Sequence, residues 1–240
     1  MIEYIFAEIF KFNKSKLKYS TLVLYIPNII VFLMYLINPK YYLVNWNEYL
    51  NLIITFLNYF VCPLAFGIIA SYTFGSDYED KTINVLFTYP IKRVYLLISK
   101  LVFILIIITI TLISIFFLSL ISGLALKHEV FTSKIFIYYF IAFIKMSIFH
   151  FMLIFIICGI AIKTKNILPG IIFIIAATLS NLLLVNTKLS SFYPWSAPLL
   201  LSPHDNIGRS YIFYTGSIFS LIIIFLIGLA ICIKNYRYTE

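Results

Sequence analysis

Six apolar runs, separated by short polar segments, occupy most of this 240-residue chain; they are 19–37, 50–73, 95–123, 135–162, 167–185 and 211–233. Most approach or exceed the roughly 20 residues that a helix needs to cross a bilayer. Inside lipid every backbone polar group must be paired within the protein, so such runs fold as helices. We therefore predict a single all-α integral membrane domain, 1–240, with six transmembrane helices.

The composition leaves no room for an ordinary soluble domain. The chain is 62% hydrophobic and 11% charged, with a mean hydropathy of +1.02, whereas soluble domains are about 25% charged. The formal net charge of +9 fits lysines that flank spans and set topology, so we do not expect nucleic acid as a partner. Cys62, Cys158 and Cys232 all fall in apolar runs and are expected as small core residues.

The lysines and arginines predict the orientation. With the N-terminus inside, twelve of the 18 Lys and Arg residues lie on the inner side and five on the outer side. This bias favours a cytoplasmic location for both termini. Residues 1–18 carry four lysines among spaced apolar residues and predict an amphipathic helix on the inner membrane face. The run 19–37 has no small-residue cleavage site after it and is taken as an uncleaved span.

The outer segment 186–210 is too apolar for a free loop and too rich in proline for a span. We expect a short re-entrant or interfacial segment before the sixth span. Tyr193 and Trp195 are expected at the level of the lipid headgroups, where such rings concentrate.

The segment Phe74–Arg93 is the only long inner loop in this topology. It holds three of the nine acidic residues within four positions, Asp77, Glu79 and Asp80. A short helix near 78–87 would place these acids in its first turn, which suits the helix macrodipole. The loop's apolar residues at spacings of three and four would form one face for a partner, and a proline would end the helix; they are Ile83, Leu86, Phe87 and Pro90. The alternative is a solvated loop between two spans.

The loop resembles one from a known family. Its acidic residue, threonine, apolar pair, proline, basic residue and following lysine are Asp77, Thr82, Leu86–Phe87, Pro90, Arg93 and Lys100. This order is similar to the inner loop of the membrane (permease) subunit of type-2 ABC transporters, in the small six-span branch associated with bacitracin and lantibiotic resistance. The family usually has Glu at the acidic position; here Asp77 holds it, and Glu79 and Asp80 lie close enough to substitute.

The resemblance implies a coupling helix near 78–87 that docks on a separate ATPase. The residues carried over as ATPase contacts are Asp77, Tyr78, Glu79, Asp80, Lys81, Thr82, Ile83, Leu86, Phe87, Pro90 and Arg93. It also implies two ATPase copies and a second permease subunit, identical or related. No GxxxxGK[ST] loop occurs and no Gly precedes a Lys, so ATP and Mg are expected on the ATPase. The chain itself is then no enzyme and needs no cofactor.

The family further implies a location in the bacterial plasma membrane. It also implies an amphipathic, membrane-active substrate, such as an antimicrobial, bacteriocin or cytolytic peptide, which the transporter exports or expels.

Lys145 and His150 stand inside the fourth apolar run, 135–162. An ionisable residue near the centre of a membrane is a functional candidate by default. We expect Lys145 and His150 at a subunit interface or along the substrate path, near Asn181 of the next run. The alternatives are a lysine stem that reaches the membrane surface and a hydrogen-bonded core histidine. No second His or carboxylate stands at ligand spacing, so no metal site is expected.

Other classes of function fit the sequence less well. An intramembrane enzyme would need a constellation such as HExxH or GxSxG, and neither is present. A self-contained channel or secondary transporter would need charges at the midplane and paired broken helices. A non-transporting membrane sensor subunit also stays open.

Overall fold

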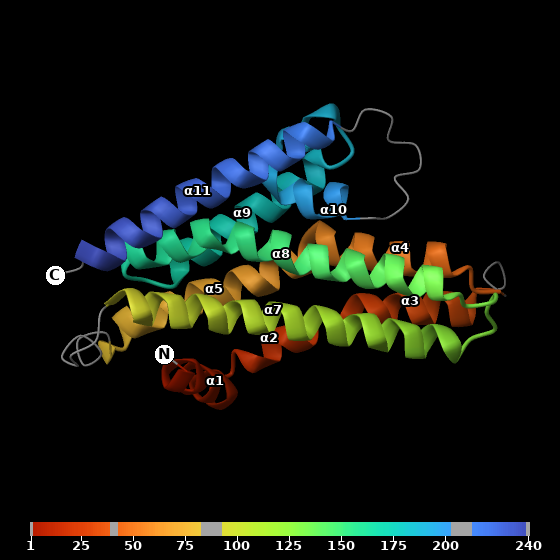
Figure 1. The fold of residues 1–240 in the computed structure, drawn as a ribbon, viewed down its shortest axis with the longest axis horizontal. Coiled ribbons are helices and arrows are strands. Elements are labelled where there is room, and N and C mark those ends of the chain that lie inside the picture. Colours follow the sequence, from red (N-terminus) through yellow and green to blue (C-terminus); the bar gives the residue numbers. More distant parts are fainter. Residues whose placement is uncertain (1, 39–42, 83–92, 203–212, 239–240) are drawn as a thin grey trace.

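The computed structural model describes residues 2–38, 43–82, 93–202 and 213–238 (Figure 1). These ranges fold into helices, joined by short turns and one isolated β-bridge between Val44 and His128. The all-α prediction is therefore confirmed for the described part of the chain.

Five helical segments are long and apolar enough to cross a membrane. They are α2 (Lys18–Val23) with α3 (Ile26–Ile37), α4 (Trp46–Phe56) with η2 (Leu57–Val61) and α5 (Cys62–Glu79), α7 (Arg93–Leu124), α8 (Ser133–Thr164), and α11 (Tyr214–Tyr238). A sixth apolar helix, α9 (Leu168–Leu184), has 17 residues and is about 25 Å long. The sequence placed most boundaries within a few residues. The second span is the exception, because it begins at Trp46 and ends at Glu79.

The helices form an elongated bundle, and both chain termini lie at one end of it (Figure 1). We call this the terminal end; it also carries the end of α5, the start of α7 and the turn between α8 and α9. The turn between α7 and α8 lies at the opposite end. Which end faces the cytoplasm stays a prediction from the lysine and arginine bias.

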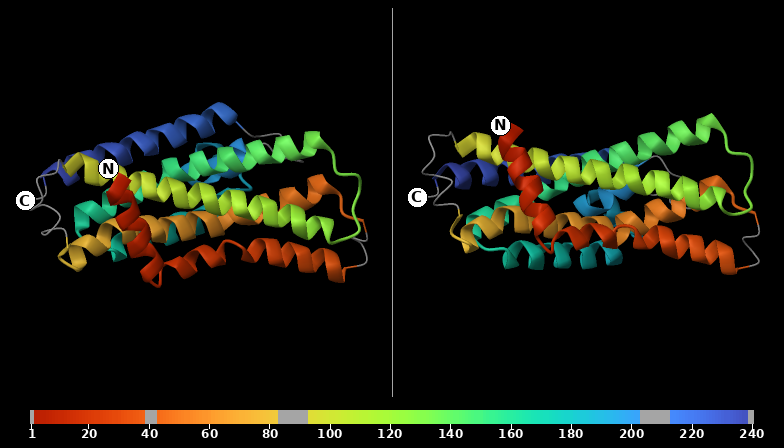
Figure 2. Two further views of the ribbon diagram at one scale, coloured as in Figure 1. Left: turned by 60° about the horizontal axis from the view of Figure 1, so that its bottom comes forward. Right: turned by 90° about the horizontal axis from the view of Figure 1, so that it is seen from below.

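A separate N-terminal helix, α1 (Ile2–Lys14), lies across the bundle at a steep angle to α7 (Figure 2). Its Phe12 is buried, with its ring centroid 5.6 Å from that of Phe103. Phe6 and Phe10 are exposed. The helix carries Lys11 and Lys14 among apolar residues, and its predicted place on the inner membrane face stays a prediction.

Glycines let the central helices approach one another closely. A Cβ added at Gly228 of α11 would collide with the backbone of α8 at Phe155 and Ile156. In the same way Gly67 and Gly75 of α5 face Ile174 and Ile167 of α9. Small residues at such crossings are the usual means of packing helices in membranes.

The predicted segment before the last span forms three short helices, η3 (Lys188–Phe192), η4 (Pro194–Ser196) and α10 (Ala197–Leu201). They pack into the bundle, and Ala197, Leu199 and Leu200 are buried. Trp195 is only 4% exposed and packs 5.5 Å from Phe173. The ring therefore packs against α9 and the core, and its expected depth at the level of the headgroups stays a prediction. Residues 203–212 lie outside the described ranges.

Candidate functional site

The acidic residues of the predicted coupling segment belong to the end of span 2. Helix α5 continues through Glu79, Asp80 is its C-cap residue, and Lys81 follows in a left-handed conformation with φ 55°. The acids thus stand in a last turn instead of the first turn of a separate helix, which corrects the sequence prediction. A helix C-terminus disfavours acids, but here cations and a backbone N–H compensate Asp77 and Glu79. Ile83, Leu86, Phe87 and Pro90 lie outside the described residues.

Asp77 lies between two lysines that come from different helices. Its carboxylate is 3% exposed. One oxygen, Oδ1, lies 2.5 Å from Lys11 Nζ of α1, and the other, Oδ2, lies 2.6 Å from Lys100 Nζ of α7. Lys100 also lies 2.6 Å from Glu8 Oε1 and donates to the Thr73 carbonyl at 3.1 Å. Glu8, Lys11, Asp77 and Lys100, here called the ion-pair cluster, contain two positive and two negative groups.

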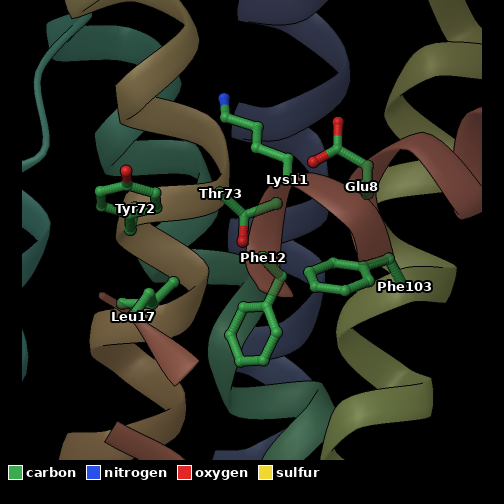
Figure 3. Close-up of a pocket in the computed structure, with 7 residues that line it drawn as sticks. All are labelled: Glu8, Lys11, Phe12, Leu17, Tyr72, Thr73 and Phe103. Carbon is green, nitrogen blue, oxygen red and sulfur yellow. The ribbon is translucent and has the colours of Figure 1, made fainter. Parts of the chain in front are cut away.

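The ion-pair cluster fastens α1 to the ends of two spans. Beside it, α1, α5 and α7 enclose a pocket with an empty volume of about 210 Å³. Figure 3 shows Glu8 and Lys11 on one side of this pocket and the Phe12 and Phe103 rings on the other. Removing one partner of a buried ion pair leaves an uncompensated charge and costs about 3–5 kcal/mol. The cluster therefore holds α1, the end of α5 and the start of α7 together.

Glu79 joins the end of α5 to the start of α9. Its Oε1 accepts a hydrogen bond of 2.8 Å from the Ile167 N–H, and a carboxylate at a helix N-terminus is favourable. Ser71 Oγ donates to the Ile167 carbonyl at 2.7 Å, and Gly75 leaves space for the Ile167 backbone. Ser71, Gly75 and Glu79 recur every four residues and so share one face of α5. The turns after α5 and before α9 are thereby held side by side.

Two lysines in these turns have an unusual backbone conformation. Among the described residues, Lys81 and Lys165 are the non-glycine residues with positive φ, 55° in each case. Glycine is the usual residue at such a helix end, and retained strain of this kind often marks a functional site. The exposed side chains around them are Asp80, Lys81, Thr82, Lys163 and Lys165, here called the two-turn face.

The other predicted contact residues have the following positions. Tyr78 is half-buried, and the Thr82 hydroxyl lies 3.3 Å from the Asp77 carbonyl oxygen. Arg93 begins α7 and lines a pocket of about 450 Å³ with Leu97, Ile233 and Tyr236 of α7 and α11. All are at the terminal end.

His150 and Asn181 converge on a break in span 2. The π-helix η2 is followed by Pro63, which has no N–H for the carbonyl of Tyr59 four residues earlier. Asn181 Nδ2 of α9 donates to that carbonyl at 3.1 Å. His150 Nε2 of α8 lies 3.1 Å from Asn58 Oδ1. Both side chains are buried at 1% exposure or less, so each bonds to span 2 within the chain.

Lys145 has the opposite environment, because its side chain is exposed on α8. Ile141 and Ile148, one turn away on either side, are exposed as well. The structure thus separates Lys145 from His150 and Asn181, and its place at a subunit interface stays a prediction. Within the described ranges, no group of three His, Cys, Asp or Glu side chains is placed to hold a metal ion.

The sequence is similar to those of known proteins. Residues 4–181 match the pattern of the ABC-2 family transporter proteins. The chain belongs to the ABC-2 transporter family. It is 33% identical over 132 residues to the bacitracin transport permease protein BCRB of Bacillus licheniformis. This alignment covers 55% of the chain and 64% of the relative, which is less than two thirds of that protein.

Membership in the ABC-2 family fixes the general role. The chain is the membrane subunit of an ABC transporter and a multi-pass protein of the bacterial plasma membrane. ABC-2 permeases work with a partner ATPase and have no cofactor of their own.

Sequence reasoning did not find every member of the site. It identified Asp77 and Lys100 from the family pattern, but it did not pair them with Glu8 and Lys11. Glu8 and Lys11 are three residues apart, which places both on one face of α1. This shared face was the signal available in the sequence. The role of Ile167 could not be predicted from its side chain, because its backbone carbonyl and N–H bond to Ser71 and Glu79.

Proposed function

We propose that this chain is the permease of an ATP-driven exporter of amphipathic, membrane-active molecules, such as antimicrobial, bacteriocin or cytolytic peptides. A separate ATPase docks on the segment 74–93. Family membership and the likeness to a bacitracin transport permease support this proposal. The observation that carries it is the burial of Asp77 between Lys11 and Lys100 beside the docking segment.

The acids of the docking segment have different tasks in this proposal. Asp77 positions the segment from inside the bundle, because its carboxylate is buried and fully paired with lysines. Asp80, Lys81 and the rest of the two-turn face contact the ATPase, because they are exposed at the terminal end. Glu79 holds the turn before α9 against the turn after α5 and so adds Lys163 and Lys165 to the contact surface.

Closure of two ATPase copies on ATP and Mg then moves the end of α5. The ion-pair cluster passes this movement to α1 and α7, and Glu79 passes it to α9. The nucleotide shifts the population between two permease states, since it favours the state that fits the closed ATPase pair.

A second permease subunit, identical or related, completes the membrane path. A lysine near the centre of a lipid-facing helix costs about 2.5–3.5 kcal/mol on insertion scales. We therefore assign the exposed Lys145 face of α8 to contact with the second subunit or with the water-filled path between the two.

Co-purification with the ATPase tests the proposal. The tagged chain is expressed with a candidate ABC ATPase, and an Asp80→Ala/Lys81→Ala/Lys165→Ala variant is expressed in the same way. A Lys134→Ala/Lys188→Ala variant, with both changes away from the terminal end, is the control. We expect the wild type and the control to retain the ATPase and to raise bacitracin resistance of the host, and the first variant to lose both. A chain that is stable alone and binds no ATPase would favour a channel or a sensor subunit.

A further inference from the structure

The break in span 2 divides this span into two halves with different anchors. The half farther from the terminal end, α4, is held by two hydrogen bonds. The Tyr49 hydroxyl lies 2.8 Å from Ser122 Oγ of α7, and Tyr139 of α8 donates to Asn51 Oδ1 at 3.0 Å. The half nearer the terminal end, α5, is held by the ion-pair cluster and by the backbone of Ile167. A movement applied at the terminal end therefore reaches α5 first.

The hydrogen bonding between these halves is weakened at one place. The Cys62 N–H bonds to the Leu57 carbonyl, five residues earlier, as in a π-helix. Pro63 then removes the donor that the Tyr59 carbonyl would have in an α-helix. Kinks at prolines and π-bulges are the places where long helices bend. The chain between Leu57 and Pro63 is thus the part of span 2 best able to bend.

One amide connects this break to the short helices of the segment 188–201. Asn181 donates through Nδ2 to the Tyr59 carbonyl, and its Oδ1 accepts a 2.7 Å hydrogen bond from Ser196 Oγ of η4. Asn181 and Ser196 are both 0% exposed. One turn earlier on α9, the Tyr193 hydroxyl donates to the Ala177 carbonyl at 2.7 Å. Burial raises the pKa of Tyr193, which keeps this hydroxyl protonated as a donor.

We propose that residues 57–63 are a hinge in span 2 and that Asn181 is the positioning residue that links this hinge to the segment 188–201. When α5 tilts, the Tyr59 carbonyl moves with it, and the amide of Asn181 carries the displacement to Ser196. The segment 188–201, which packs beside the middle of the bundle, then shifts each time the terminal end is moved. The transmission of movement through Asn181 rests on the proposed ATP-driven function. The hydrogen bonds of Asn181 are present whether or not that function is correct.

A double-mutant cycle tests the link between Pro63 and Asn181 without any partner. Pro63→Ala gives the Tyr59 carbonyl a backbone donor, so it no longer depends on Asn181. We expect Asn181→Ala to lower the Tm of the purified chain by several degrees, and to lower it by less than half as much in the Pro63→Ala background. Ser196→Ala should lower the Tm equally in both backgrounds, because its bond does not involve span 2. Equal losses for Asn181→Ala in the two backgrounds would overturn the pairing.

Distance measurements in the complex with the ATPase test the hinge. Spin labels are placed at Lys188→Cys, at the start of η3, and at Lys134→Cys, at the start of α8. Both positions are exposed, whereas Cys62, Cys158 and Cys232 are buried and so poorly labelled. We expect ATP to shift the distance between the labels in the wild type. The shift should disappear in Asn181→Ala and in Ser196→Ala, while ATPase binding and turnover persist.

The matched control is Thr178→Val on the same helix, because its buried hydroxyl bonds only to the carbonyls of its own helix. This variant should keep the shift. A full shift in Asn181→Ala, or no shift in a wild-type complex that hydrolyses ATP, would overturn the hinge and leave the proposed function intact. A wild type that recruits no ATPase would refute the proposed function and the hinge role together.

Discussion

The ion-pair cluster and the break in span 2 solve the same problem, a polar group inside an apolar bundle, with different chemistry. At the terminal end, four charged side chains from three helices balance one another. At the break, neutral groups are used: two amides, an imidazole and a hydroxyl. Charges are tolerated near the end of a span, where water is close, whereas near the centre neutral donors can satisfy a carbonyl at lower desolvation cost. The two regions should therefore respond differently to substitution.

The largest effect is expected from Lys100→Met. This change leaves Asp77 and Glu8 without their buried cation and should destabilise the protein by about 3–5 kcal/mol, because the charge stays uncompensated. We expect loss of the folded, monodisperse protein in detergent, measured by size-exclusion chromatography. The double variant Asp77→Asn/Lys100→Met should recover much of the loss. A double variant no better than the single one would show that the cluster does not act as a charge-balanced unit.

Lys11→Met should be clearly milder than Lys100→Met. The Lys11 side chain is 34% exposed, compared with 2% for that of Lys100, so water screens the remaining charge on Asp77. The expected result is a folded protein with a lower Tm and a more protease-sensitive N-terminus, because α1 loses one of its anchors. Limited proteolysis checks this. An equal loss for both lysine variants would contradict the assigned difference in burial.

His150→Leu tests the neutral region. It leaves the buried Asn58 Oδ1 without its donor and should cost about 1–3 kcal/mol, the penalty of an unsatisfied buried polar group. Removing both partners in Asn58→Leu/His150→Leu should cost less than the sum of the single changes. Thermal unfolding of the four proteins measures the coupling, and strict additivity would argue against the bond.

The smallest effect, with opposite sign, is expected from Lys165→Gly. Glycine has no Cβ to oppose a positive φ, and relief of the left-handed conformation is worth roughly 1 kcal/mol. The Tm should rise slightly while ATPase recruitment falls, because a cation of the two-turn face is lost. A variant with higher Tm and undiminished recruitment would remove Lys165 from the docking surface.

The sequence predicted the fold well because hydropathy and span length are local properties. It located α7, α8 and α11 to within a few residues of the runs 95–123, 135–162 and 211–233. It missed the extension of span 2 to Glu79, because charged residues were taken to end a span. In the structure Asp77 is neutralised by Lys11, 66 positions earlier in the chain, and by Lys100, 23 positions later.

The site was predicted in part. Asp77 was identified by its place in a motif, but its burial depends on long-range pairing that no local pattern encodes. His150 and Asn181 were identified as unusual residues in apolar runs, but their partners on span 2 were not. Asn181 bonds to the Tyr59 carbonyl because Pro63 leaves that carbonyl without a backbone donor, and His150 bonds to the Asn58 side chain. A proline within a span, read together with a buried amide elsewhere, was the available signal.

The order of the charges along the chain has a consequence for biosynthesis. Glu8 and Lys11 leave the ribosome first, Asp77 follows on the second span, and Lys100 arrives last on the third. Until the third span is inserted, Asp77 has only the partly exposed Lys11 as a partner, and Glu8 lacks its own buried cation. All four side chains of the ion-pair cluster are thus present only once the third span has been made, so α1 and the end of span 2 can reach their final packing only after that step.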